Sequence, residues 1–184
     1  IHVCVGTSLA LIIPNGLMSA RSHMKRDAVD MGLVKSIGVG VLIGVAIGTV
    51  IADNLAGPSL QLVFACAVVV LAIMMLVDPS RYKLVSSMPK APWPSAAGVG
   101  IGSISSLIGI GGGTLSVPFM TLCTVPIHRA IGTASALGVV IAVPGTLGFI
   151  LIGMGEAGRP PLSIGYVNVL AWLLILPTSL LCVK

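Results

Sequence analysis

A cluster of glycines in the second half of the chain is the strongest candidate for a binding site. Residues 109–114 read Gly-Ile-Gly-Gly-Gly-Thr and lead directly into the apolar stretch 115–122. We predict a helix there, whose first N–H groups have no partner within the helix and whose dipole attracts negative charge. Because glycine lets a ligand approach these donors closely, the pattern predicts an anion site without lysine or arginine. Its candidate ligands are Gly109, Gly111, Gly112, Gly113 and Thr114.

Polar side chains in other apolar stretches could complete such a site. A histidine facing a cavity within a membrane can donate a hydrogen bond to an anion or carry a proton. His128 and Ser135 fall on one helical face with Gly132, at positions i, i+7 and i+4. The amide of Asn15, in the middle of an apolar stretch, needs a partner. The candidate substrate ligands outside the glycine loop are His2, Thr7, Ser8, Asn15, His128, Thr133 and Ser135.

Structural roles remain open for the same residues. The glycines could serve only to let helices cross closely, the histidines could be satisfied at helix ends, and the hydroxyls could bond helix carbonyls. Proline lacks an N–H group, so we expect helix breaks or kinks at Pro14, Pro118 and Pro144. Small residues spaced four apart predict a ridge for close helix packing. This ridge consists of Gly40, Gly44, Gly48 and Ala52.

The composition is that of an integral membrane protein. Of the 184 residues, 56% are hydrophobic and 8% are charged, whereas soluble domains carry about 25% charged residues. Long apolar runs predict helices rather than the alternating strands of a barrel. The net charge of +5 comes from loops between apolar runs, where membrane topology explains it. We therefore expect a lipid bilayer as a partner, and no nucleic acid, metal ion or cofactor.

Charged loops divide the chain into predicted helices at residues 1–20, 36–52, 60–77, 130–152 and 164–183. The excess of lysine and arginine places loops 21–35 and 78–94 in the cytoplasm, and loop 53–59 outside. The chain is thus expected to cross the plasma (inner) membrane several times.

The uncharged run 91–127 is too long for one simple span, which needs about 20 apolar residues. Its glycine-rich centre would leave backbone groups without helical partners, which lipid tolerates only beside protein or a polar cavity. We predict a discontinuous helix here. A re-entrant pair of half-helices, which we favour, puts loop 153–163 outside, and one broken crossing puts it inside.

Two segments of the chain share a pattern. IHVCVGTS at residues 1–8 resembles IHRAIGTA at residues 127–134, and an apolar stretch with a proline follows each. This similarity predicts two internal repeats. Residues 1–94 would hold the remainder of the first repeat with a cytoplasmic linker, and 95–184 a second repeat truncated at its C-terminal end. The first residue is not methionine and an apolar run reaches the last residues, so we expect part of a longer protein.

Three stretches together resemble one family of membrane permeases. They are GIGGGTLSVPFM, IHRAIGTASAL and IHVCVGTSLALIIPNGLMSARSHMKRDAVDMGLV. The chain resembles the TauE/SafE family of sulfite and organosulfonate exporters along nearly all of its length. The resemblance implies two repeats of spanning helices, of which this chain would lack the first and last elements. One departure is that Ala134 follows the second Gly-Thr pair where Ser8 follows the first.

These observations predict an all-α integral membrane protein, a helical bundle of two repeats with a glycine-broken helix. We expect a secondary transporter, not an enzyme, that exports a small sulfur oxyanion or organosulfur acid by alternating access. Backbone N–H groups at broken helices would hold the anion. Homo-oligomers are left open. The alternatives are a passive anion channel and an intramembrane hydrolase with Ser8 or Ser135 as nucleophile, although no G-x-S-x-G loop is present.

Overall fold

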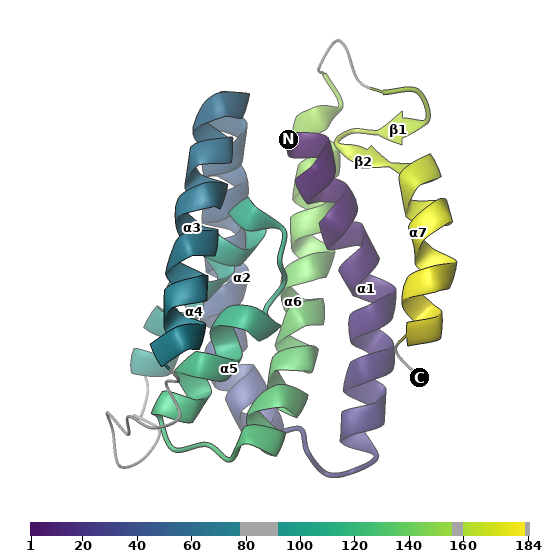
Figure 1. Ribbon diagram of the computed structural model, residues 1–184. Helices are drawn as coiled ribbons and strands as arrows, with labels where there is room; N and C mark the ends of the chain where they lie inside the picture. The colour runs from purple at the N-terminus through teal and green to yellow at the C-terminus, as the bar shows by residue number, and fades with distance from the viewer. Residues whose placement is uncertain (78–91, 156–159, 183–184) are drawn as a thin grey trace.

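The computed structural model describes residues 1–77, 92–155 and 160–182, and shows a helical bundle (Figure 1). The all-α fold class predicted from the sequence is confirmed. In the part of the chain that the structure describes, four helices are long and apolar enough to cross a membrane, namely α1, α2, α3 and α6. The helices within the described residues are α1 (His2–Met24), α2 (Met31–Asn54), α3 (Gly57–Val77), α4 (Trp93–Ile108), α5 (Gly113–Leu122), α6 (Ile127–Gly153) and α7 (Val169–Cys182).

Helices α2 and α4 pack with almost no space between their backbones. A side chain at Gly40 or Gly44 would collide with backbone atoms of Ser95 or residue 99 on α4. The hydroxyl of Ser95 donates to the carbonyl of Ser36 (2.7 Å), and that of Ser103 to the carbonyl of Gly44 (2.9 Å). The predicted small-residue ridge is therefore confirmed as the surface that receives α4.

The glycine loop lies between α4 and α5. Helix α4 ends at Ile108, residues 109–112 are not helical, and α5 begins at Gly113. Figure 1 shows α4 rising beside α2 to mid-height, and α5 descending to the end of the bundle where α4 began. The loop thus sits inside the bundle rather than at either end. Its depth in a bilayer stays a prediction, as do the internal repeat and the division of the chain at residue 94.

The helices are not broken at the predicted prolines, because α1 continues through Pro14, α5 through Pro118 and α6 through Pro144, and kinks at these positions stay a prediction. A proline inside a helix frees the carbonyl four residues before it. In α1 that carbonyl belongs to Ala10, and it accepts a hydrogen bond from the indole of Trp172 on α7 (3.1 Å). An acceptor freed by proline can therefore be satisfied by a neighbouring helix while the helix itself continues.

The predicted helix at residues 164–183 was wrong in its first turn. A small hairpin of β1 (Ser163–Ile164) and β2 (Val167–Asn168) comes first, turning at Gly165 with φ +56°. Helix α7 starts only after Asn168, whose side-chain oxygen accepts from the N–H of Ala171 (2.8 Å). An asparagine at this place is a strong start signal for a helix, and it overrode the apolar character of the preceding residues.

Candidate functional site

A pocket of about 470 Å³ lies between α1, α6 and the glycine loop. It brings together five of the sequence-predicted ligands from three distant stretches of the chain. These are Asn15 on α1, Ser135 on α6, and Gly111, Gly112 and Gly113. Its remaining lining residues are Ile12, Gly16, Ser19, Ile110, Val117, Ile131, Ala134 and Gly138. No charged side chain lines this pocket, which we call the central pocket.

The first turn of α5 offers free backbone donors beside the central pocket. The first hydrogen bond of this helix runs from Ser116 N–H to the carbonyl of Gly112 (2.9 Å), and no side chain caps it. The N–H groups of Gly113, Thr114 and Leu115 therefore have no acceptor in the described part of the chain. With the helix dipole, these donors favour a negative ligand at the start of α5.

The loop needs its glycines for two separate reasons. Gly109 (φ +72°) and Gly111 (φ +81°) adopt the left-handed conformation that other residues rarely take, and they flank Ile110. Gly112 has an ordinary φ of −75°, but a side chain there would lie 3.0 Å from the backbone nitrogen of Gly138 on α6. The alternative role of close helix crossing thus holds for Gly112, which also lines the pocket.

The loop is tied to α1 by a predicted site residue. The hydroxyl of Ser8 donates to the carbonyl of Gly109 at 2.7 Å. Ser8 does not line the central pocket, and neither does Gly109. Thr114 does not line it either, so its candidate contribution to the site is its backbone N–H group rather than its side chain. Ser8 therefore positions the loop.

Two polar side chains of α1 and one of α6 face the central pocket. Asn15 donates from its amide to the carbonyl of Leu11 (3.0 Å), and its side-chain oxygen is buried without a partner. Ser135 lies 3.1 Å from Ser19 between their hydroxyl oxygens. Sequence reasoning missed Ser19, although it lies one turn after Asn15 on the same face.

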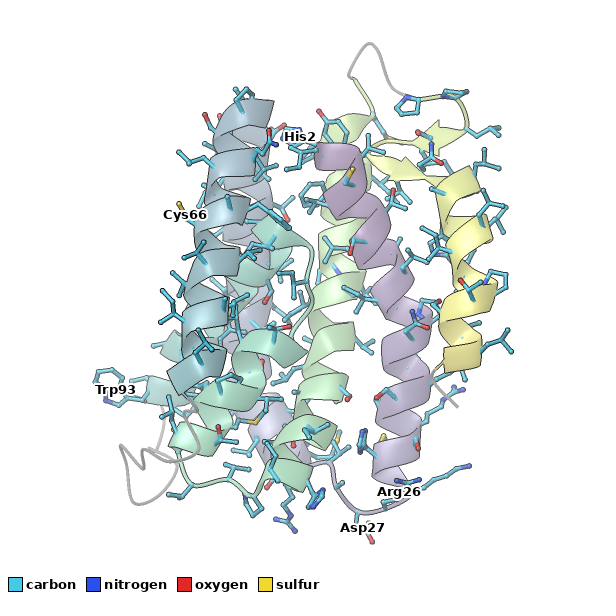
Figure 2. All side chains as sticks on the ribbon, viewed as in Figure 1. His2, Arg26, Asp27, Cys66 and Trp93 are labelled. Atoms are coloured by element: carbon cyan, nitrogen blue, oxygen red, sulfur yellow. The ribbon has the colours of Figure 1, made fainter. Side chains whose placement is uncertain are left out.

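The two histidines predicted as ligands do not reach the central pocket. His2 is at the opposite end of the bundle from Arg26 (Figure 2). Its ring lies 3.0 Å from the carbonyl oxygen of Ala52 and stacks on Tyr166, with ring centres 5.0 Å apart. His128 lines a separate, smaller pocket near Arg26. The structure therefore separates both histidines from the glycine loop.

Thr133 fastens the loop between α1 and α2 onto α6. Its hydroxyl oxygen accepts from the N–H of Asp30 (3.0 Å), and it is fully buried. At Gly132 any side chain would collide with the carbonyl of Ala28. The carboxylate of Asp30 in turn caps α2 by accepting from the N–H groups of residues 32 and 33.

Thr7 makes the corresponding contact at the other end of the bundle. Its hydroxyl oxygen accepts from the N–H of Asn168 (2.9 Å), just before α7. A side chain at Gly6 would collide with the carbonyl of Tyr166. The Gly6–Thr7 pair on α1 thus contacts the segment that follows α6, and the Gly132–Thr133 pair on α6 contacts the segment that follows α1. In both cases a backbone carbonyl packs on the glycine, and the N–H two residues later donates to the threonine hydroxyl. The structure gives both threonines a packing role outside the central pocket.

The geometry does not provide a nucleophile for hydrolysis. Among the described residues, no histidine ring bonds the hydroxyl of Ser8 or Ser135. Ser8 donates to Gly109 and Ser135 donates to Ile131 (3.0 Å). A serine hydrolase needs its nucleophile within hydrogen-bond reach of a base. In the described ranges, no three residues that commonly bind metal ions come together.

Long apolar helices, four of them in the described residues long enough to cross a membrane, define an integral membrane protein. The chain belongs to the sulfite exporter TauE/SafE family, whose model matches residues 1–184. It is 33% identical over 176 residues to a probable membrane transporter protein of Haemophilus influenzae, covering 95% of this chain and 66% of the relative. The family model is described as a sulfite exporter, and this relative as a probable membrane transporter protein.

A second relative extends this comparison. The probable membrane transporter protein YdhB of Bacillus subtilis is 25% identical over 159 residues, covering 83% of this chain and 65% of the relative. The chain thus spans just under two thirds of the length of the curated relatives it matches. No solved structure matches the chain significantly.

Proposed function

We propose that the protein is a secondary transporter that exports a small sulfur oxyanion or organosulfur acid across the plasma (inner) membrane, which the chain crosses several times. One observation carries the proposal: the uncharged central pocket is bordered by a helix start whose N–H groups have no acceptor. A sulfite or sulfonate head group has three oxygens that can accept from such donors. The family and both relatives support transport as the activity.

The lining of the central pocket suits a ligand that must be bound and then released. Asn15, Ser19 and Ser135 add polar groups around the backbone donors of α5. Ile12 and Val117 offer apolar contact for a short organic tail. Because no lysine or arginine lines the pocket, the anion is held by dipoles and hydrogen bonds alone. Transport requires binding weak enough for the substrate to leave on the other side.

A second pocket on the other face of the loop supports alternating access. This pocket has a volume of about 500 Å³ and shares two lining residues with the central pocket, Ile12 and Ile110. We take the side chains of Ile12 and Ile110 as the partition between the pockets, because they line both. Ile110 is flanked by Gly109 and Gly111, whose left-handed conformations allow backbone rotations that other residues resist. Movement of Ile110 would open one pocket as it closes the other.

The proposal is tested with the full-length protein in proteoliposomes. Radiolabelled sulfite should exchange with unlabelled sulfite by saturable counterflow, which a passive channel would not show. Thiosulfate, sulfate and short sulfonates serve as competitors that define the substrate. The Gly112→Leu variant should lose binding, because a side chain there meets the backbone of α6 and crowds the pocket.

Gly57→Leu is the matched control, since a side chain at Gly57 meets no atom within 4 Å. Equal sulfite binding by the wild type and Gly112→Leu would reject the anion loop. Complete loss of catalytic turnover in Ser135→Ala, with sulfite binding unchanged, would favour the hydrolase alternative instead.

A further inference from the structure

A small basic pocket lies at the end of the bundle that holds the loop between α1 and α2. Its volume is about 250 Å³, and it is lined by His23, Arg26, Ala28, His128 and Ile131. Three of these five residues are basic, and they come from α1, the loop after it, and α6. Figure 2 shows Arg26 at this end, where the positive-inside rule predicts the cytoplasm.

The basic pocket is next to the central pocket along the contact between α1 and α6. Ile131 lines both pockets. On α6, His128 lies one turn before Ile131, and Ser135 lies one turn after it. On α1, Ser19 of the central pocket lies one turn before His23 of the basic pocket. A solute passing between the two pockets would move between one and two helical turns, roughly 5–10 Å.

The acidic residues of this region do not neutralise the basic pocket. Asp30 caps α2 and lies 3.8 Å from the guanidinium of Arg129, so its charge is already engaged. Asp27 lies at the outer tip of the loop in Figure 2 and does not line the pocket. The pocket lining therefore carries only basic and neutral side chains.

We propose that the basic pocket is a capture site for the transported oxyanion on the cytoplasmic side. The inference rests on the proposed function, because the ligand is the same anion that the central pocket holds. The guanidinium of Arg26 can donate two parallel hydrogen bonds to an oxyanion, and the rings of His23 and His128 add donors from two helices. The anion then passes Ile131 into the central pocket.

The two pockets have complementary electrostatic roles. The central pocket has no charged lining, so it attracts an anion only at short range. The charge of Arg26 in the basic pocket raises the local anion concentration over a longer distance, and salt screens this effect. Removing a charge from the basic pocket should therefore weaken capture without changing the later steps, and most strongly at low ionic strength.

The test measures sulfite transport by the full-length protein in proteoliposomes at low ionic strength. We expect Arg26→Gln and His128→Gln each to raise KM about three- to tenfold, with the maximal rate unchanged. Lys25→Gln is the matched control, because Lys25 is an exposed cation beside Arg26 that does not line the pocket. Its KM should change less than about twofold. High salt should bring the variants and the wild type together.

Each outcome decides the matter. An unchanged KM in both pocket variants overturns the capture site, while their continued transport leaves the proposed function standing. An equal rise in KM for Lys25→Gln also overturns the capture site, because the rise would then come from the loss of any surface charge at this end of the bundle. A wild type that moves no sulfite, thiosulfate or sulfonate overturns both proposals. Circular dichroism of the variants verifies that the helices are intact.

Discussion

Substitution of two neighbouring glycines, Gly112 and Gly113, distinguishes a glycine required by close packing against α6 from one that only borders the pocket. At Gly112 an added Cβ would lie 2.9 Å from Cδ1 of Ile141 and 3.0 Å from the backbone nitrogen of Gly138. At Gly113 an added Cβ would meet no atom within 4 Å. Both glycines line the central pocket. The same change, glycine to alanine, therefore adds a clashing methyl group at Gly112 and a non-clashing one at Gly113.

The magnitude follows from which atoms can move. The tip of Ile141 can shift, although it is fully buried, but the backbone of α6 at Gly138 cannot yield without displacing the helix. Overpacking of this kind costs about 1–3 kcal/mol. Gly113 is the first residue of α5, where alanine fits without strain and reduces the entropy of the unfolded chain. We expect Gly113→Ala to stabilise by about 0.4–1 kcal/mol.

Thermal unfolding of the detergent-solubilised protein provides the measurement. Gly112→Ala should unfold at a lower temperature than the wild type, and Gly113→Ala at the same or a higher temperature. Sulfite binding should fall in Gly112→Ala, because relief of the contact requires the loop or α6 to shift at the pocket. The reasoning is refuted if the two variants lose equal stability, or if Gly113→Ala is the less stable one.

Substitutions at Ser8, Asp30 and Gly132 test the contacts that position the site, with Asp30→Asn and Gly138→Ala as controls. Ser8→Ala removes the hydroxyl bond to the glycine loop, and thermal unfolding should show a loss of about 0.5–1.5 kcal/mol. Asp30→Ala should cost about 0.5–2 kcal/mol by removing the cap of α2, while Asp30→Asn, which can still cap, should lose clearly less by the same assay. Gly132→Ala meets the carbonyl of Ala28 and should lower folded yield and unfolding temperature. Gly138→Ala, with its nearest contact at 3.8 Å, should leave the folded yield unchanged and keep or raise the unfolding temperature.

Much of the architecture was predictable because apolar runs, charged loops and small-residue spacing are local signals. The predicted helices at residues 36–52 and 130–152 fall inside α2 and α6. The glycine loop could be found because successive glycines conflict with a helix of membrane length. The hairpin before α7 was missed because its residues are apolar enough to resemble a helix start.

The candidate site was only partly predictable. Helical spacing shows which residues share a face of a helix, but it does not show which pocket along that face each residue reaches. His128 and Ser135 share a face of α6, yet seven residues of helix separate them by about 10 Å. They therefore line different pockets. The threonines of the Gly-Thr pairs were predicted as ligands, but their partners are N–H groups of distant loops. Long-range contacts of this kind leave no local pattern in a sequence.

The contacts around α1 and α6 bear on which part of the bundle moves during transport. Each of the two helices holds the segment that follows the other, through Thr7 and Thr133, so a rocking of α1 against α6 would break both contacts. The glycine loop is tied to α1 by the single hydroxyl bond of Ser8. Rotation of the loop about Gly109 and Gly111 would break that bond, disturb the bond from the Gly109 N–H to the carbonyl of Ser105 (2.9 Å), and carry Ile110 with it. Such a rotation leaves the contacts of Thr7 and Thr133 between the α1 and α6 regions in place, so the loop is the smaller unit that can move without separating the two helices.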